Sequence, residues 1–402
     1  LMRIYLAVQL GRAPPERSWL WFWVFLGAAI MIKGPIAPLL GLTTVTALCL
    51  WDRSYRWLRA LHVLRGLLVL AALNLPWAIL VTLATDGAFL DIAVRSDFLA
   101  KLNAGQESHG APIGTYIMLV GLLIWPGCIL LPRAVAQVPI LLAHAQSRFL
   151  IAWIVPFWLL IELIPTKLPH YPLPVFPALA VLLVCAVEVP LPGDPKSVKL
   201  RLKLQRYLAL ASEYAMLAIA GLLAAVVLWA AITHGGQTGG RAFSFAMISL
   251  VLLAVVLWQG ILWHRGGGIR PVAIILLVGV LFNFSLISGL LPALSRLHVS
   301  TAIDQAITRL QLNPPAIAAA GFHEPSLVFL RGSDLLLLNG SEAALFLAEA
   351  PGGLAIVENR QREAFLAMAG QLGEELLPPY QISGFNVSKG NDVLIFLYRS
   401  AL

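Results

Sequence analysis

A series of long apolar runs across residues 1–291 restricts most strongly how this chain can fold. A membrane-spanning helix needs about 20 predominantly apolar residues, and hydropathy predicts nine such segments. They are placed at residues 17–31, 34–50, 64–84, 113–131, 148–164, 168–187, 209–231, 243–263 and 272–291. Because 59% of the 402 residues are hydrophobic and only 12% are charged, one soluble core could not enclose them. We therefore expect a polytopic α-helical membrane protein rather than a conventional soluble enzyme, a disordered chain or a coiled coil.

The distribution of charge predicts how these segments are oriented. Lys and Arg are in excess in the connections at 51–65, 132–147, 188–208 and 264–271, which we expect to be cytoplasmic. The connection at 85–112 carries more acidic residues and is expected outside. Nine passes then place the N-terminus inside and the C-terminus outside. The net charge of +8 is typical of cytoplasmic loops and lipid headgroup contacts, so we expect membrane lipids as partners and no nucleic acid.

The composition changes after Pro292, where polar residues reach the density of a soluble domain. Short strands are predicted at Ser326–Leu330, Leu354–Val357 and Asp392–Tyr398, and a helix at Gln361–Leu372. The chain is thus expected to have two domains. Residues 1–291 would form the transmembrane helical domain with an outer loop at 85–112, and residues 292–402 a small extracytoplasmic α/β domain.

Charged residues at the edges of apolar segments are the first candidates for chemistry, because lipid makes a buried charge costly. Lys33 lies between two apolar runs in IMIKGPIAPLL, a stretch without an acidic residue. A lipid phosphate would be a suitable partner for this cation. The alternative is a lysine whose side chain simply extends to the membrane interface.

The second candidate is PTKLPHYPLP at residues 165–174, whose four prolines prevent a regular helix. Irregular backbone at a membrane edge is tolerated where it lines a cavity or is buried in protein. Lys167 and His170 are predicted to bind a donor phosphate, and Tyr171 to stack on a sugar or anchor at the interface. The alternative is a proline-rich turn with an interfacial tyrosine. Glu162, just before this stretch, could form an ion pair with Lys167 or face a polar cavity.

The third candidate is the outer loop, which contains DFLAKLNAGQESHGAP at residues 97–112. Lys101 and His109 are proposed substrate contacts, since a loop of this length is more often functional than filler. For His109, the roles of general acid or base, metal ligand and plain surface residue all stay open. The sequence contains no HExxH, P-loop, GxSxG or GxGxxG motif in a suitable context. No cofactor is assigned, and a divalent metal is left open.

Several segments together resemble one family. IKGPIAPLL, LNLPWAILV, ESHGAPIGTY, IWPGCILLPRA and TKLPHYPLPVFPALAVLL are similar, in that order, to segments of certain bacterial membrane glycosyltransferases. These enzymes are related to protein O-mannosyltransferases and to the lipid A aminoarabinose transferase. GFHEPSLVFLRG and GFNVSKG resemble the C-terminal outer domain of the same family. The resemblance extends from about residue 17 to the C-terminus, and TKLPHYPLP is its most specific part.

The resemblance implies a C-type glycosyltransferase fold in the bacterial inner membrane, with an active site that faces the extracytoplasmic side. It implies a sugar donor carried on a polyprenyl phosphate, such as undecaprenyl or dolichyl phosphate, and a lipid, glycan or protein acceptor. Lys33, Lys167, His170 and Tyr171 fall in matching segments, and His109 matches the HxxP of the outer loop. The family carries its acidic catalytic residues in a first outer loop that precedes the region present here. No catalytic base is therefore assigned, and we expect the chain alone to bind the donor lipid without transferring sugar.

Two other classes stay open on the sequence. A polytopic transporter or flippase would use broken helices to bind a headgroup, but the chain contains no internal repeat of the kind expected for its two halves. A non-catalytic assembly protein would combine a membrane anchor with an outer interaction domain. Sugar transfer from a polyprenyl phosphate donor would separate the enzyme from both.

Overall fold

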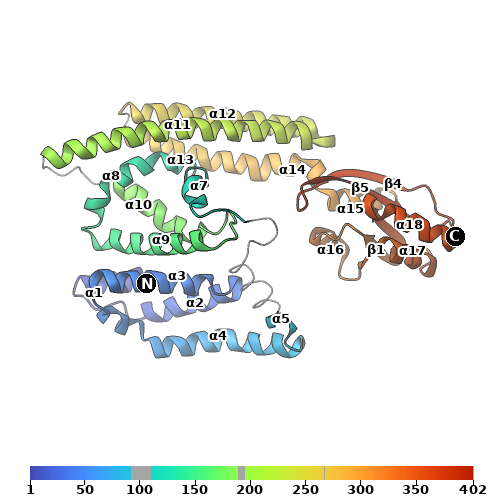
Figure 1. Cartoon of the computed structure of the whole chain (residues 1–402), viewed down its shortest axis with the longest axis horizontal. Coiled ribbons are helices and arrows are strands. Elements are labelled where there is room, and N and C mark those ends of the chain that lie inside the picture. Colours follow the sequence, from blue (N-terminus) through green and yellow to red (C-terminus); the bar gives the residue numbers. More distant parts are fainter. Residues whose placement is uncertain (92–109, 189–194, 267, 402) are drawn as a thin grey trace. The chain divides into compact units, whose positions relative to one another are not determined.

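The computed structural model describes residues 1–91, 110–188, 195–266 and 268–401, and most of these residues are helical (Figure 1). The chain divides into two compact units. The first comprises Leu1–Ile219 and Leu257–Leu276, and the second comprises Ala220–Val256 and Leu277–Leu402.

Five helices within the described residues are long and apolar enough to cross a membrane. The first three are α4 (Val63–Ala84), α9 (Ala145–Leu163) and residues Arg206–His234 of α11 (Pro195–His234). The other two are Gly236–His264, which contains α12 (Gly239–His264), and Ile269–Ala293, which begins with α13 (Ile269–Phe284). Three shorter apolar helices are α2 (Ser18–Lys33), α3 (Ile36–Asp52) and Leu173–Val187, which joins η4 (Leu173–Val175) to α10 (Phe176–Glu188). The polytopic helical architecture is confirmed, whereas the count of nine passes remains a prediction.

The segment predicted at 113–131 is not a single unbroken helix. The chain forms α7 (Thr115–Leu123) and then a second helical stretch, Gly127–Leu141, and the two are bent by 108°. The second stretch joins η3 (Gly127–Leu130) to α8 (Leu131–Leu141), so most of the connection predicted at 132–147 is helical. Pro126 lies at the bend, and proline both lacks the N–H that a continuing helix needs and clashes with the preceding turn.

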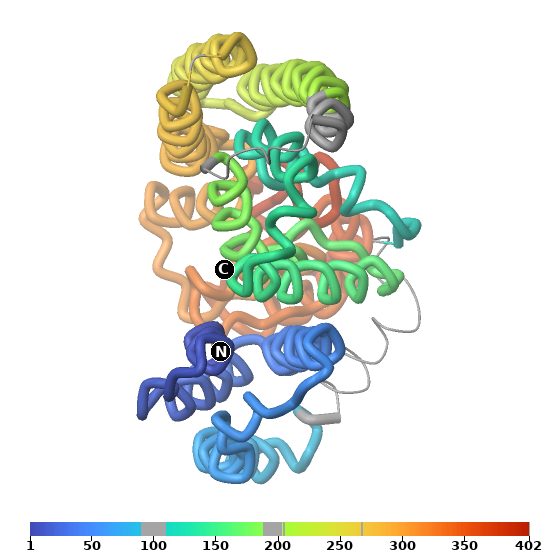
Figure 2. Tube along the Cα trace, turned by 90° about the vertical axis from the view of Figure 1, so that its left-hand side faces the viewer, coloured from blue at the N-terminus to red at the C-terminus, as the bar shows by residue number. Residues whose placement is uncertain are grey.

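In the first unit, α3 packs along α9, and Figures 1 and 2 show the two helices side by side. The short helix α1 (Met2–Gln9) and η1 (Arg56–Leu61) complete a buried cluster around their ends. Asp52, at the end of α3, accepts hydrogen bonds from Tyr5 Oη at 2.9 Å and Gln9 Nε2 at 2.8 Å. It also pairs with Arg148 Nη1 of α9 at 3.1 Å. One carboxylate thus connects α1, α3 and α9.

In the second unit, the ends of α11 and α12 pack against a helix that changes its winding. After α13 the chain makes a π-helical turn, η6 (Ser285–Leu290), and then the short α14 (Leu291–Ala293). Gly289 lies against the ring of Phe245, where a Cβ atom would approach Cδ1 to 2.3 Å. Ser249 and Ser285 form a buried hydrogen bond of 3.1 Å. Small residues and one polar pair therefore set the close packing of these helices.

The C-terminal part of the second unit is a five-stranded sheet with the order β2-β1-β3-β5-β4. Its strands are β1 (Ile317–Ala320), β2 (Leu336–Leu338), β3 (Leu354–Glu358), β4 (Tyr380–Asn386) and β5 (Asn391–Tyr398). The first three are parallel, and β5 pairs antiparallel with both β3 and β4. One face packs against α15 (Val299–Arg309) and α16 (Pro325–Arg331), and the other against α17 (Gly340–Glu349) and α18 (Asn359–Gln371). The predicted small α/β domain is confirmed.

Within that domain, the predicted strands at 354–357 and 392–398 and the helix at 361–372 are confirmed. The strand predicted at Ser326–Leu330 is wrong, because these residues form α16. Pro325 occupies the first turn of that helix, where its missing N–H costs nothing. Leu327 is buried while Phe329 is 88% exposed, so the apolar run covers several sides of a short helix rather than one face of a strand.

Candidate functional site

The proline segment, residues 165–174, begins where α9 ends. Ile164 is extended, with ψ of 126°, as a residue before proline prefers to be. Helical winding resumes only at Leu173. Nine residues of irregular backbone therefore separate two apolar helices, and Lys167, His170 and Tyr171 of the predicted site lie on this break.

Lys167 is 8% exposed and turns back onto the end of α9. Its ammonium donates to the carbonyl oxygens of Ile161 at 3.3 Å, Glu162 at 2.7 Å and Ile164. The last carbonyls of a helix have no partner within the helix, and a lysine there also complements the helix dipole. Burial lowers the pKa of Lys167, and the nearby Glu162 carboxylate partly offsets this effect. A phosphate that contacts Lys167 directly would therefore have to displace one of these carbonyls.

Glu162 is 2% exposed and connects α9 to the start of α7. Its Oε2 accepts from the backbone N–H of Gly114 at 3.0 Å, and its Oε1 from that of Ile117 at 2.9 Å. An anion at a helix N-terminus satisfies unpaired N–H groups and complements the helix dipole. The sequence left an ion pair or a polar cavity open for Glu162, and its contacts instead make it the acceptor that caps α7.

Tyr116 is a residue of this site that sequence reasoning missed. Its hydroxyl donates to the carbonyl oxygen of Leu168 at 3.0 Å, and its ring centre lies 5.7 Å from Lys167 Nζ. The available signal was its position in ESHGAPIGTY, a segment already assigned to the family resemblance. Tyr116 fixes the proline segment from the side of α7.

Lys33 and His170 form the exposed part of the site. Lys33 is the last residue of α2, which ends because Gly34 adopts φ of +62°. The pKa of His170 is lowered by desolvation and, as a second cause, by the positive charge of Lys33. The ring of Tyr171 meets the ring of His170 edge to face, with 5.1 Å between the centroids. Lys33 is thus near enough for its charge to act on His170, whose ring packs against that of its sequence neighbour Tyr171.

The end of the predicted outer loop is joined to the same segment. Gly110 forms an antiparallel bridge with Thr166, and the N–H of Ala111 donates to the carbonyl oxygen of Pro165 at 3.3 Å. Lys101 and His109, the substrate contacts proposed in this loop, lie outside the described residues. Within the described ranges, no group of three or more His, Cys, Asp or Glu side chains is arranged to hold a metal ion.

Comparisons with known proteins point to one kind of enzyme. No protein-family model matches the sequence. The undecaprenyl phosphate-alpha-4-amino-4-deoxy-L-arabinose arabinosyl transferase of Erwinia tasmaniensis is 28% identical over 183 residues, which are 44% of this chain and 32% of that protein. The enzyme of the same name from Pseudomonas aeruginosa is 30% identical over 192 residues, 46% of this chain and 33% of that protein. The matched regions thus span about a third of the curated relatives.

Solved structures show a broader likeness. The crystal structure of ArnT from Cupriavidus metallidurans bound to undecaprenyl phosphate matches with a TM-score of 0.62 and 18% identity, over 93% of this chain and 68% of that one. The structure of the same protein in the apo state gives a TM-score of 0.60 at 19% identity. The chain therefore has the polytopic C-type fold of these structures, with a small sheet domain at its C-terminus.

Proposed function

We propose that this chain belongs to a membrane glycosyltransferase that moves a sugar from a polyprenyl phosphate to a lipid, glycan or protein acceptor, on the extracytoplasmic side of a bacterial inner membrane. The observation that carries the proposal is the broken backbone between two apolar helices, where the exposed His170 packs against Tyr171 and is near enough to Lys33 to be affected by its charge. It is supported by the fold shared with a structure that contains undecaprenyl phosphate, and by curated relatives named as arabinosyl transferases.

The chemistry requires a group that stabilises the phosphate when it leaves the sugar. A cation and a directional hydrogen-bond donor aimed at the departing oxygens lower the barrier because the negative charge grows there. Lys33 supplies an exposed ammonium and His170 an exposed imidazole, so both can contact the phosphate. In this proposal the buried Lys167 adds positive charge and holds the backbone that carries His170, through its bonds to α9.

The remaining predicted contacts are assigned to the sugar and the acceptor. Tyr171 offers a partly exposed ring next to His170, suitable for stacking on a sugar. Lys101 and His109 remain proposed substrate contacts on sequence grounds. No residue is assigned as the catalytic base, and the sugar and the acceptor are named only by class.

The proposal is tested by measuring how undecaprenyl phosphate binds to the full 402-residue chain in lipid nanodiscs. Quenching of tryptophan fluorescence reports the binding. Lys33→Ala and His170→Ala should each weaken binding by about 10-fold or more, because a hydrogen bond to a charged group contributes about 1.5–3 kcal/mol. Lys203→Ala and His144→Ala remove a matching side chain from exposed positions on α11 and at the start of α9, and both should bind as the wild type does. Wild-type affinity in both site variants would overturn the proposal.

A further inference from the structure

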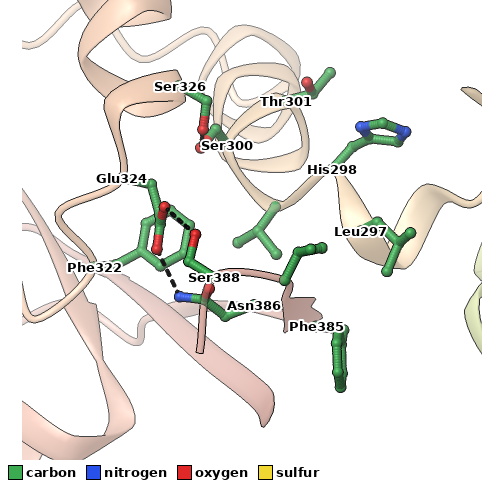
Figure 3. Close-up of a pocket in the computed structure, with 12 residues that line it drawn as sticks. Leu297, His298, Ser300, Thr301, Phe322, Glu324, Ser326, Phe385, Asn386 and Ser388 are labelled. Atoms are coloured by element: carbon green, nitrogen blue, oxygen red, sulfur yellow. Dashed lines mark hydrogen bonds between the residues drawn. The ribbon is translucent and has the colours of Figure 1, made fainter. Parts of the chain in front are cut away.

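The C-terminal domain contains a cavity of about 180 Å³ that the proposed transfer reaction does not use. It lies between the start of α15, the turn that leads into α16, and the end of β4 (Figure 3). Its walls join the two segments GFHEPSLVFLRG and GFNVSKG, which lie more than fifty residues apart in sequence and had no assigned role. Seven of its side chains are polar: His298, Ser300, Thr301, Glu324, Ser326, Asn386 and Ser388.

Five of these polar groups are already held in place by one another. Glu324 accepts from Asn386 Nδ2 at 2.9 Å and from Ser388 Oγ at 3.0 Å, as the dashed lines in Figure 3 show. Ser300 and Ser326 form a hydroxyl pair with 2.8 Å between their oxygen atoms. Such mutual bonds fix the orientation of the side chains before any ligand arrives, which lowers the cost of binding.

The same groups keep hydrogen-bonding capacity for a ligand. Each carboxylate oxygen has two acceptor sites, and each oxygen of Glu324 receives one of the two bonds described. The amide of Asn386 has a second N–H, and one hydroxyl of the serine pair can donate outward. The cavity therefore presents several closely spaced donors and acceptors around one carboxylate.

Size and charge narrow the class of ligand. A volume of about 180 Å³ is below the range of about 300–1,000 Å³ typical of pockets for drug-sized ligands, so one small ring fills it. The Glu324 carboxylate opposes a phosphate or another anion. Phe322 and Phe385 add apolar ring surface to the walls, which suits a molecule with both hydroxyl groups and C–H faces.

We propose that this cavity binds one saccharide unit, with vicinal hydroxyl groups hydrogen bonded to Glu324, Asn386 and Ser388 and a C–H face against Phe322 or Phe385. The site is independent of the donor-phosphate site in the first unit. A neutral sugar and an amino sugar share the required hydroxyl chemistry, while an anionic sugar phosphate is disfavoured by Glu324.

The test is saturation-transfer NMR on the full chain in phosphatidylcholine nanodiscs, because the common maltoside detergents themselves carry a sugar. The probes are a panel of neutral methyl hexosides and pentosides, the corresponding amino sugars, and glucose 1-phosphate. At least one neutral or amino sugar should show saturable transfer, and glucose 1-phosphate should bind no more tightly than glucose. A preference for the amino sugar that Glu324→Gln abolishes would identify the cationic member of the class as the ligand.

Three variants make the assignment specific. Glu324→Gln should weaken binding about 10-fold, and Ser388→Ala should weaken it about 3-fold, because each removes part of one hydrogen-bonded group. Glu363→Gln makes the same chemical change at an exposed position of α18 and should have no effect. All three should retain wild-type affinity for undecaprenyl phosphate, which separates this site from the proposed function. The proposal would be overturned if no sugar of the panel bound, or if Glu324→Gln and Ser388→Ala both bound sugar as tightly as the wild type.

Discussion

Lys33 and Lys167 both lie at the ends of apolar helices, but they differ in burial and therefore in their proposed roles. Lys167 is buried and directs its three N–H donors to carbonyl oxygens in the last turn of α9 and just after it. Lys33 is exposed in the last turn of α2. A buried lysine with satisfied donors is a fixed structural element, whereas an exposed one can adjust to a ligand. Sequence alone could not distinguish them, because both appear as a single cation beside proline.

The contacts of Lys167 lead to a prediction about stability. Lys167→Met keeps much of the side-chain volume but leaves the carbonyl oxygens at the end of α9 without their donor. We expect a loss of about 1–3 kcal/mol in unfolding free energy, the usual cost of an unsatisfied buried polar group. Thermal melting followed by tryptophan fluorescence measures the effect, and Lys203→Met on α11 is the control. Equal melting temperatures for Lys167→Met and the control would show that these bonds contribute nothing.

A second residue-scale prediction concerns the protonation of His170. Its pKa lies below the usual value of about 6.5 because of desolvation and the Lys33 charge. The ring is therefore mostly neutral at pH 7 and becomes charged only at lower pH. In Lys33→Gln the repulsion is gone, so the pKa of His170 should rise. Titration of ¹³C-labelled histidine by NMR, with His170→Gln used to assign the signal, measures the shift. An unchanged pKa of His170 would show that the charge of Lys33 does not act on it.

At the scale of elements, the packing of α2 on α4 depends on one small residue. The ring of Trp23 covers Gly66 so closely that a Cβ atom there would lie 1.9 Å from Trp23 Cε2. Trp23 cannot move away freely, because it is 7% exposed and its Nε1 donates to the carbonyl oxygen of Leu61 at 2.7 Å. The absence of a side chain at residue 66 is thus what allows the two helices to approach.

Gly66→Ala should therefore destabilise the protein by about 1–3 kcal/mol, the usual cost of overpacking a filled site. Gly41→Ala in α3 is a matched control, because a Cβ atom there would meet no other atom within 4 Å. Alanine favours a helix over glycine by up to about 1 kcal/mol, so the control should be neutral or more stable. Thermal melting of the two variants side by side decides the point, and a Gly66→Ala protein as stable as Gly41→Ala would refute this packing argument.

The elements also show where sequence reasoning reaches its limit. The apolar helices could be predicted because their composition alone requires lipid or a deep core. The bend after α7 could not be predicted, because one proline hardly changes the mean hydropathy of an apolar run. Strands β1 and β2 are only four and three residues long, too short for a clear alternation of apolar and polar residues. The proline segment could be chosen as the candidate site from its sequence, but its contacts with Tyr116 and Gly114 come from a distant part of the chain and depend on the tertiary fold.

At the scale of the whole molecule, the orientation in the membrane is the main open prediction. The distribution of Lys and Arg predicts that residues 196–206 lie inside and residues 340–360 outside. Cys49, Cys128 and Cys185 would first be replaced by alanine. Single cysteines would then be introduced at the exposed positions Lys203 and Glu349.

In intact spheroplasts, an impermeant maleimide should label the cysteine at position 349 and leave the one at position 203 unlabelled until the membrane is opened. The reason is that positively charged connections are retained on the cytoplasmic side during insertion. Detergent-solubilised protein, in which both positions should react, controls for accessibility. Labelling of both positions in intact spheroplasts would contradict the predicted topology and with it the extracytoplasmic placement of the sheet domain.

The π-helical turn at Ser285–Leu290 is a place where this helix can change its length. Its hydrogen bonds reach one residue further along the chain than those of an α-helix, so the turn accommodates one additional residue. Deleting that residue would restore α-helical winding and leave the turns on either side in phase. The same deletion within the regular winding of α13 would rotate the turns that follow by about 100°, and Ser285 and Gly289 would then no longer face Ser249 and Phe245 of α12. A single-residue deletion should thus be tolerated better at this turn than within α13.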